Sequence, residues 1–193
     1  KLYRAVLDID DIVALSIGTR PDCVPPEVLD MLLRLNDIKP VTVELGLQTI
    51  HEKSIEYIRR GYDNECYVQT AKRLNENGIE VVTHIILGLP DETEQMMLQS
   101  VELACRYSQG IKLQLLHVLR GTDLALDYEN GKFSVMDMEQ YVSLVKKCVD
   151  IIPPNVVIHR LTGDGDKRHL IAPMWSADKK RVLNALNNAL LKS

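Results

Sequence analysis

Residues able to bind a small molecule stand at the ends of two short apolar runs in this sequence. Residues 44–49 read Glu-Leu-Gly-Leu-Gln-Thr, and residues 83–90 read Thr-His-Ile-Ile-Leu-Gly-Leu-Pro. Each run reads as a strand that ends in a polar side chain and a glycine and is followed by a helix. In parallel α/β folds, side chains and free backbone amides converge at the carboxyl ends of strands, and ligands bind there. The two segments therefore predict a ligand-binding face made from several strand ends.

Three residues in these segments are candidates for contact with a ligand. Gln48 could hydrogen-bond a ribose hydroxyl or a carboxylate, or it could cap the following helix. His84 lies in an otherwise apolar strand, where a histidine is either a ligand-binding group or a hydrogen-bonded core residue. Gly88 either lets the backbone approach a cofactor closely or simply closes the strand-to-helix turn.

Other charged groups have a plainer structural interpretation. Arg20 and Asp22 flank a proline and read as a local ion pair. The formal net charge of −4 argues against a large nucleic-acid surface, because phosphate binding needs clustered Lys and Arg. A basic cluster near the C-terminus is either a solvated surface or a site for phosphate or RNA. Its members are His159, Arg160, Lys167, Arg168 and His169.

The four cysteines lie about forty residues apart, at positions 23, 66, 105 and 148. This spacing fits neither a zinc site nor a close-set iron–sulfur motif. Three of the four fall in helical patterns, where a buried, reduced thiol is expected. Reduced thiols, together with the lack of an apolar run long enough to cross a bilayer, predict a cytoplasmic protein.

The elements that must position the candidate residues follow a regular alternation of apolar strands and helices. Strands are expected at residues 12–17, 41–47, 79–87, 111–119 and 156–159. Helices are expected at residues 28–35, 51–60, 64–77, 91–108, 135–151 and 177–191. The apolar strands are those of a sheet buried on both faces, and the alternation predicts parallel strands joined by right-handed crossovers.

The fold class expected is α/β, as an open or partial parallel (β/α) barrel. A closed barrel of eight units typically needs about 250 residues, and only five strands can be counted in the 193 residues here. Residues 1–122 are expected to form the barrel part, and residues 123–193 a helical and strand extension packed on it. The chain begins in what reads as the end of a helix, so a preceding part of the barrel is expected.

The order of the motifs resembles the radical S-adenosylmethionine superfamily over nearly the whole chain. Thr-Arg-Pro-Asp at residues 19–22 and the segment 44–49, followed by Arg-Gly-Tyr at 60–62, are similar to the radical domain of the elongator catalytic subunit. Residues 83–90 and Arg-Gly-Thr at 120–122 resemble its next two strands. With Ala-Pro-Met-Trp at 172–175, the bacterial YhcC-like branch is the best match.

The resemblance implies S-adenosylmethionine as a cofactor and assigns residues to it by position. Gln48 and His84 match positions that hold its ribose in related enzymes, although relatives carry an Asp at the second position. Arg60 matches an arginine that reaches the methionyl carboxylate.

Further positions follow from the same resemblance. Gly88 would let the adenine pack close to the backbone. The backbone of Val118 and Leu119 would hydrogen-bond the adenine edge. Gly18 stands where relatives carry an acidic residue, so that contact is expected to be lost or supplied elsewhere.

The resemblance also implies a [4Fe–4S] cluster in the full-length protein, held by a Cys-x₃-Cys-x₂-Cys loop that this sequence lacks. The cluster cysteines are expected upstream, and the fragment is expected to be inactive alone. The full protein would cleave S-adenosylmethionine reductively to a 5′-deoxyadenosyl radical that acts on an unknown substrate. Homo-association through the edge of the first strand is also expected, because an unpaired strand edge invites pairing.

Two other functions stay open on the residues alone. One is a non-radical α/β-barrel lyase or isomerase that uses His84 or His117 as an acid–base group. The other is an RNA-binding module without catalysis that uses residues 160–168.

Overall fold

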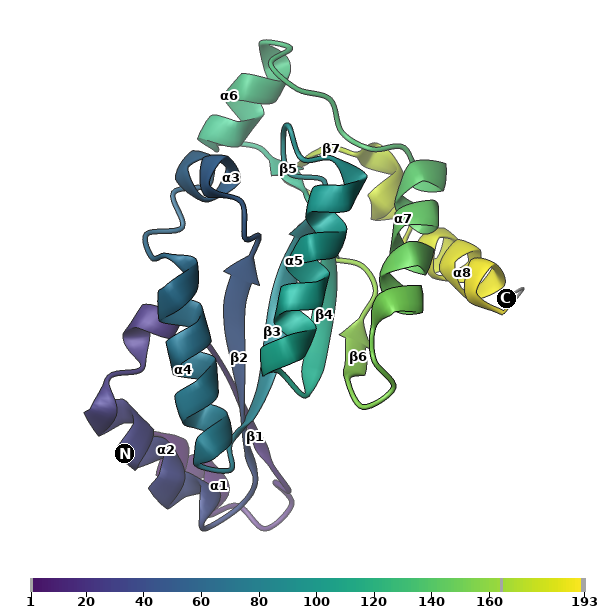
Figure 1. The fold of residues 1–193 in the computed structure, drawn as a ribbon. Coiled ribbons are helices and arrows are strands. Elements are labelled where there is room, and N and C mark those ends of the chain that lie inside the picture. Colours follow the sequence, from purple (N-terminus) through teal and green to yellow (C-terminus); the bar gives the residue numbers. More distant parts are fainter. Residues whose placement is uncertain (1, 164, 192–193) are drawn as a thin grey trace.

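A parallel sheet of five strands forms the centre of the computed structural model, which describes residues 2–163 and 165–191 (Figure 1). In spatial order the strands are β1 (Leu15–Thr19), β2 (Val41–Gln48), β3 (Glu80–Leu87), β4 (Gly110–Leu115) and β6 (Val157–Arg160). All neighbouring strands are parallel. The predicted α/β fold, with parallel strands adjacent in sequence order, is confirmed.

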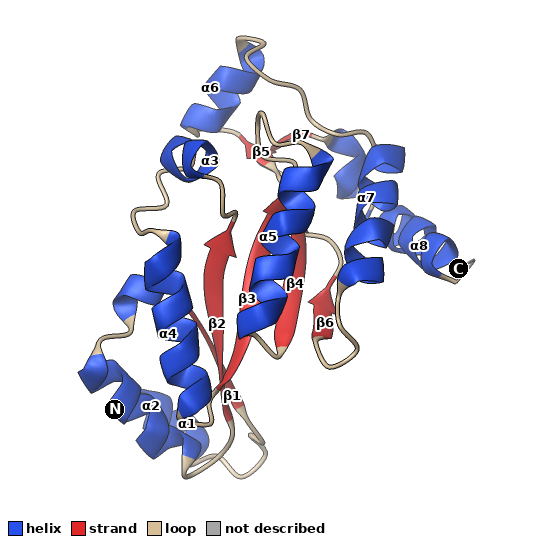
Figure 2. Ribbon diagram, viewed as in Figure 1, coloured by secondary structure: helices blue, strands red, loops and turns tan. Residues whose placement is uncertain are grey.

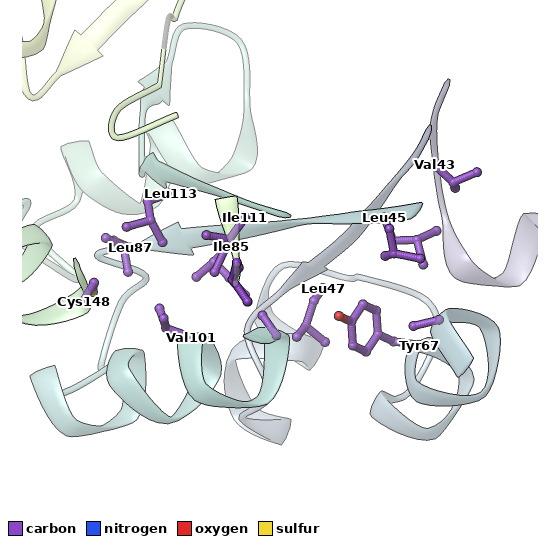
Figure 3. Close-up of a cluster of buried hydrophobic side chains, with 14 of the residues drawn as sticks. Val43, Leu45, Leu47, Tyr67, Ile85, Leu87, Val101, Ile111, Leu113 and Cys148 are labelled. Atoms are coloured by element: carbon purple, nitrogen blue, oxygen red, sulfur yellow. The ribbon is translucent and has the colours of Figure 1, made fainter. Parts of the chain in front are cut away.

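The sheet has one apolar face, which the helices cover. Val43, Leu45 and Leu47 of β2 are fully buried, and Figure 3 shows them pointing to the same side as Tyr67. The residues between them in β2 are only half-buried. The expectation of burial on both faces is therefore wrong, because the second face carries the polar residues of a period-two pattern.

The helices lie mainly against that apolar face, where α4 and α5 cross in front of β2, β3 and β4 (Figure 2). None of the helices in the described part of the chain is both long and apolar enough to cross a bilayer. Their bounds are α1 (Leu2–Leu7), α2 (Pro26–Asn36), α3 (Glu52–Tyr57), α4 (Asn64–Glu76), α5 (Glu94–Tyr107), α6 (Asp123–Glu129), α7 (Met138–Ile151) and α8 (Lys179–Leu190).

Side-chain caps decide where the longer helices begin. Asp63 caps α4, since its carboxylate accepts from the Cys66 backbone N–H at 2.7 Å. Thr93, Asp137 and Asp178 cap α5, α7 and α8, each by accepting from a backbone N–H three residues later. The predicted helix starts at residues 91, 135 and 177 were therefore too early. The helices begin after Thr93, Asp137 and Asp178, because these side chains accept hydrogen bonds from the free N–H groups of the first turn.

The fourth predicted strand is two strands. β4 ends at Leu115, and the Leu116 N–H makes one more bond to Leu87 O at 2.9 Å. The chain then leaves the sheet, and β5 (Val118–Leu119) pairs antiparallel with β7 (Leu170–Ala172). Apolar residues recur throughout residues 111–119, and this pattern hid the change of sheet. The first strand likewise begins at Leu15 rather than at residue 12.

The four cysteines are free thiols. Cys148 is buried, Cys66 and Cys105 are half-buried, and Cys23 is exposed. Burial raises the pKa of the Cys105 thiol to about 11. The three cysteines of α4, α5 and α7 are free thiols inside helices, as predicted, but only Cys148 is buried.

Candidate functional site

Polar side chains from four neighbouring strands meet on the face of the sheet opposite the packed core. At their centre is the carboxylate of Glu44 in β2. Its Oε1 accepts from Ser16 Oγ at 2.7 Å. Its Oε2 accepts from His84 Nε2 at 2.7 Å and forms an ion pair with Lys112. Gln114 Nε2 lies 2.7 Å from His84 Nδ1, on the other side of the imidazole. We call Ser16, Glu44, His84, Lys112 and Gln114 the open-face network.

The charges of the network follow from its hydrogen bonds. Burial raises the pKa of Glu44, but donors from Lys112, Ser16 and His84 outweigh it and bring that pKa down to about 2. Burial lowers the pKa of His84, and Glu44 offsets this only in part. At neutral pH the network therefore holds a carboxylate and a neutral imidazole. Because the carboxylate only accepts, the imidazole proton is on Nε2.

Gln48 lies at the carboxyl end of β2 in a strained backbone conformation. Its φ is +65°, and the Thr49 N–H donates to Leu47 O at 2.8 Å. Together they describe a γ-turn centred on Gln48, of the rare kind with positive φ. Strain of this sort costs of order 1–3 kcal/mol and is found most often at functional sites.

The Gln48 amide folds back over the open face. Its Nε2 lies 2.7 Å from the point where a Cβ at Gly46 would stand, and Gly46 is the register partner of His84. Gln48 and His84 therefore share one face of the sheet. The Gln48 Oε1 atom is buried and has no hydrogen-bond partner among the described residues.

Arg60 is near Gln48 but lies behind the strand end. It is only 6% exposed. Its Nη1 donates to Leu47 O at 2.9 Å and to Thr49 O at 2.8 Å, and its Nε donates to Tyr62 O at 2.9 Å. The guanidinium thus holds the two carbonyl groups on either side of the γ-turn.

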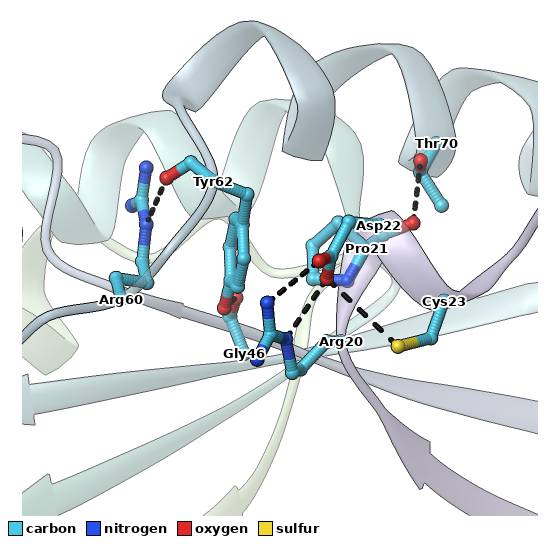
Figure 4. Close-up of polar contacts among 8 residues, drawn as sticks. All are labelled: Arg20, Pro21, Asp22, Cys23, Gly46, Arg60, Tyr62 and Thr70. Carbon is cyan, nitrogen blue, oxygen red and sulfur yellow. Dashed lines mark hydrogen bonds and ion pairs between the residues drawn. The ribbon is translucent and has the colours of Figure 1, made fainter.

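Tyr62 connects Arg60 to a second arginine, as Figure 4 shows. Its ring lies between the two guanidinium groups, with Cζ of Arg60 4.7 Å and Cζ of Arg20 5.3 Å from the ring centroid. Tyr62 Oη donates to Gly46 O at 2.6 Å. Arg20 makes the predicted ion pair with Asp22, through Nε to Oδ1 at 2.9 Å and Nη2 to Oδ2 at 2.6 Å.

The turn after β3 is tied to the end of β2. Thr49 Oγ1 donates to Glu92 Oε1, and Glu92 Oε2 is buried without a hydrogen-bond partner among the described residues. Gly88 opens this turn with φ +90°. A Cβ there would stand 2.7 Å from Met136 Cε, so the space above Gly88 is occupied by the chain itself.

The remaining predicted site residues lie at β5. Val118 is fully buried. The Arg120 N–H donates to His169 O in the strand pairing with the C-terminal segment, and Leu119 O accepts from Thr122 Oγ1 at 2.8 Å. The structure thus brings Gln48 and His84 to one face and places Arg60 behind the strand end. Gly88 lies in the turn after β3, and Val118 and Leu119 lie in the second sheet.

Sequence reasoning missed residues that are central to the site. Glu44 precedes Gln48 by two strand repeats, so the period-two spacing of residues 44, 46 and 48 could have placed it on the same face. Lys112 and Tyr62 carry no comparable signal, since their contacts depend on strand register and on a loop. Within residues 2–163 and 165–191, no group of three or more His, Cys, Asp or Glu is placed to hold a metal ion.

A cavity of about 760 Å³ opens at the same end of the sheet, between α3 and α6. Leu89 and Leu116 contribute its apolar lining. Tyr57 Oη donates to Asp127 at 2.9 Å across it. This volume is within the range of small-molecule sites.

Comparison with family models identifies two matches. The model described as the radical SAM superfamily matches residues 1–104, and that described as the Radical_SAM C-terminal domain matches residues 108–192. The resemblance inferred from the motifs is confirmed.

Curated relatives are longer than this chain. YtqA of Bacillus subtilis is 45% identical over 189 residues, which cover 97% of this chain and 59% of YtqA. YhcC of Escherichia coli K12 is 36% identical over 180 residues, which cover 92% of this chain and 58% of YhcC. The tRNA uridine(34) acetyltransferase of Methanocaldococcus jannaschii is 27% identical over 156 residues, covering 79% and 28%. The chain spans less than two thirds of the length of each.

Two solved structures share the fold. The Elp3 protein of Methanocaldococcus infernus, lacking its N-terminus, has a TM-score of 0.71 at 23% identity, over 82% of this chain and 38% of its own. The radical S-adenosylmethionine methyltransferase TsrM of Kitasatospora setae has a TM-score of 0.55 at 17% identity, over 67% and 27%. At these identities the likeness shows the fold alone.

Proposed function

This chain belongs to the radical SAM superfamily, and we propose that it forms the part of a radical S-adenosylmethionine enzyme that binds the adenosyl portion of that cofactor. The chemistry that S-adenosylmethionine and a [4Fe–4S] cluster supply in such an enzyme is reductive formation of a 5′-deoxyadenosyl radical, which takes hydrogen from a substrate. The activity of the whole protein and its unknown substrate are part of this proposal.

The observation that carries the proposal is the buried, unpartnered Oε1 atom of Gln48. A buried acceptor without a donor costs free energy, and a ligand hydroxyl would remove that cost. Because Gly46 has no side chain, the Gln48 amide and the Tyr62 hydroxyl can both lie against its backbone, where a Cβ would be only 2.7 Å and 3.3 Å from them. A ribose offers hydroxyl donors of the kind that Gln48 needs.

His84 has a different part in this proposal. Both of its ring nitrogens already have partners, Glu44 and Gln114. A direct bond to ribose would require one of these bonds to break. We therefore propose that Gln48 makes the hydrogen bond to the ribose. His84 forms part of the surface beside Gln48, against which the ribose packs.

The iron–sulfur cluster does not fit the residues described here, which hold no three-ligand group. Its ligands are proposed to lie in a part of the protein outside this chain. Without cluster iron to hold the methionyl amine and carboxylate, the chain retains only a few hydrogen bonds to the cofactor. Each nets about 0.5–1.5 kcal/mol and ordering the ligand costs several, so the expected affinity is millimolar at best.

Nuclear magnetic resonance titration of the 193-residue chain with S-adenosylmethionine tests the proposal. The expected result is weak, saturable binding, with shifts at Gly46 and Gln48 that disappear in Gln48→Ala. Exposed Gln69→Ala on α4 is the matched control and should bind like the wild type. No saturable shift at concentrations of about 10 mM would overturn the proposal. Tight binding would overturn the view that the cluster supplies most of the affinity.

The whole enzyme requires a separate test. A full-length protein containing this chain, purified without oxygen, should carry an oxygen-sensitive [4Fe–4S] cluster and release 5′-deoxyadenosine when reduced. A reconstituted protein that never yields 5′-deoxyadenosine would contradict the radical assignment.

RNA is the substrate class that we propose for the whole protein. One relative carries the name of a tRNA-modifying enzyme. In the basic cluster, Asp166 pairs with Arg168 and His169, whereas Arg160 and Lys167 have no ion pair among the described residues. Weaker RNA retention by the double variant Arg160→Gln/Lys167→Gln would support this substrate class. Equal retention of RNA by the wild type and the double variant would contradict it.

A further inference from the structure

Two arginines share the ring of Tyr62, and only one of them has a complete edge of its guanidinium available. We infer that Arg20, and not Arg60, binds the carboxylate of the ligand at this site. The inference rests on the proposed function, since it assigns a residue to the acidic end of the same ligand.

Arg60 cannot serve without dismantling the strand end. Its Nε and Nη1 already donate to backbone carbonyls at Tyr62, Leu47 and Thr49. Both Nη atoms also lie 3.1 Å from Asn64 Oδ1. Turning toward an anion would leave several carbonyl groups without a donor in a buried place, a cost that a partly solvated carboxylate does not repay.

The hydrogen bonds of Arg60 instead give it a positioning role. The carbonyl groups of Leu47 and Thr49 flank Gln48, whose positive φ would otherwise be unfavourable. One guanidinium nitrogen bridges them and so holds the γ-turn closed. Arg60 therefore acts on a ligand through Gln48, by fixing where its amide stands.

Arg20 keeps one complete edge of its guanidinium available. Its side chain is 54% exposed. Asp22 takes the edge formed by Nε and Nη2. The terminal edge, formed by Nη1 and the second Nη2 proton, has no hydrogen-bond or ion-pair partner among the described residues. That edge presents two parallel N–H groups, which match the two oxygens of a carboxylate.

Three neighbours fix Arg20 in place before a ligand arrives. Asp22 holds it through two bonds, and the Tyr62 ring supports one side of the plane. Nη2 lies 3.2 Å from the point where a Cβ at Gly61 would stand, so the absence of a side chain there leaves room for it. A pre-ordered side chain loses less entropy on binding.

The two binding groups are parts of one surface. Tyr62 Oη donates to Gly46 O, and both Tyr62 Oη and Gln48 Nε2 lie above Gly46. Arg20 packs on the same tyrosine. This surface offers an unpartnered acceptor at Gln48 Oε1 and an available cationic edge at Arg20. The ligand it fits carries hydroxyl or ammonium donors at one point and a carboxylate at another, as S-adenosylmethionine does.

The test compares two ligands that differ only in the carboxylate, namely S-adenosylmethionine and its decarboxylated form. The apparent Kd of each is measured by nuclear magnetic resonance titration for the 193-residue chain and three variants. Arg20→Gln should weaken S-adenosylmethionine about tenfold and leave the decarboxylated ligand unchanged. Arg60→Lys should weaken both ligands to the same extent. Arg34→Gln, at an exposed position on α2, is the charge-matched control and should change neither.

The outcomes separate the inference from the proposed function. Equal weakening of both ligands by Arg20→Gln would show a merely structural role and overturn the inference. A carboxylate-selective loss in Arg60→Lys but not in Arg20→Gln would return the role to Arg60 and overturn it as well. If the wild type binds neither ligand, the proposed function fails first. Circular dichroism confirms that each variant is folded. Arg20→Lys keeps the charge but not the paired N–H groups of the guanidinium, so its preference for S-adenosylmethionine over the decarboxylated ligand should be intermediate.

Discussion

Gln114 approaches Nδ1 of His84 at 2.7 Å, on the side of the imidazole that faces away from Glu44. Since an amide nitrogen only donates, Nδ1 must accept, and the proton of His84 belongs on Nε2. The histidine is thereby held in one neutral tautomer by two neighbours. An acid–base role of His84 in a lyase or isomerase would need a nitrogen that the protein already uses.

The first prediction concerns the titration of His84. Burial lowers its pKa below the ordinary 6.5, so it should remain neutral at pH 7. Gln114→Glu should raise this pKa, because a carboxylate beside Nδ1 stabilises the protonated ring. Nitrogen-15 chemical shifts of the imidazole, measured against pH, would give the protonation state of His84 in the wild type and its pKa in Gln114→Glu. A wild-type ring that is protonated at pH 7, or that carries its proton on Nδ1, would contradict the assigned network.

Glu44 should make stability depend on pH. Its pKa is about 2 in the folded protein against an ordinary 4.5, so its stabilising contribution is complete above about pH 4.5 and is lost as the pH falls through about 2. The contribution is on the order of 3 kcal/mol. Urea unfolding should show a smaller loss over this range for Glu44→Gln than for the wild type. The exposed Glu76→Gln should follow the wild type, and parallel profiles for all three would refute the prediction.

Gly46→Ala should separate binding from stability. The new methyl group would stand 2.7 Å from Gln48 Nε2, and that flexible amide can move away at a cost of less than about 1 kcal/mol. Ligand affinity should fall because the amide is displaced. Gly18→Ala on β1 is the control, since nothing lies within 4 Å of its added methyl. Titration with S-adenosylmethionine and thermal unfolding of both variants give the comparison; unchanged affinity in Gly46→Ala would count against the site.

The strained turn at Gln48 predicts that glycine is tolerated better than alanine at this position. Gln48→Gly and Gln48→Ala both lose the amide, but only glycine adopts a φ of +65° without steric cost. The glycine variant should be more stable than the alanine variant by about 1 kcal/mol. Equilibrium unfolding in urea measures the difference. Equal stabilities would mean that the positive φ carries no strain.

The free edge of β1 predicts association between chains. Within the described residues β1 pairs only with β2, and Val13, just before it, is 80% exposed. Such an edge favours pairing with another chain. Light scattering at rising concentration should show dimers or larger species, and Val13→Lys should reduce them. A monodisperse wild-type monomer at high concentration would argue against this use of the edge.

The sequence was sufficient for the parts of the fold that depend on local pattern. Apolar runs of five to eight residues between helices specify β1 to β4, and their order in the sheet follows from parallel crossovers. Gln48 was correctly placed at a strand end and His84 inside the neighbouring strand, but their shared face follows from the register of Gly46 with His84. Helix starts were less accurate. The negative charge of Asp91 suits a first helical turn, yet its φ of +62° places it outside α5.

Contacts between distant segments were beyond sequence reasoning. Lys112 reaches Glu44 from a strand two positions away in the sheet, and nothing in its own neighbourhood marks it. The direction of Arg60 depends on which carbonyl groups a strained turn presents. Spacing placed Arg60 twelve residues after Gln48, but spacing does not say which side of the strand a guanidinium occupies.

The alternation in β2 decides which residues face the site. Residues 43, 45 and 47 face the core, and residues 44, 46 and 48 face the other side. Deleting one residue near the start of β2 would exchange the two sets, sending the carboxylate of Glu44 among the helices and leucines to the ligand side. Deleting two would preserve the faces and shift only the register. If this strand is grafted into another protein, its length before Glu44 can therefore change only by an even number of residues without exchanging the two faces.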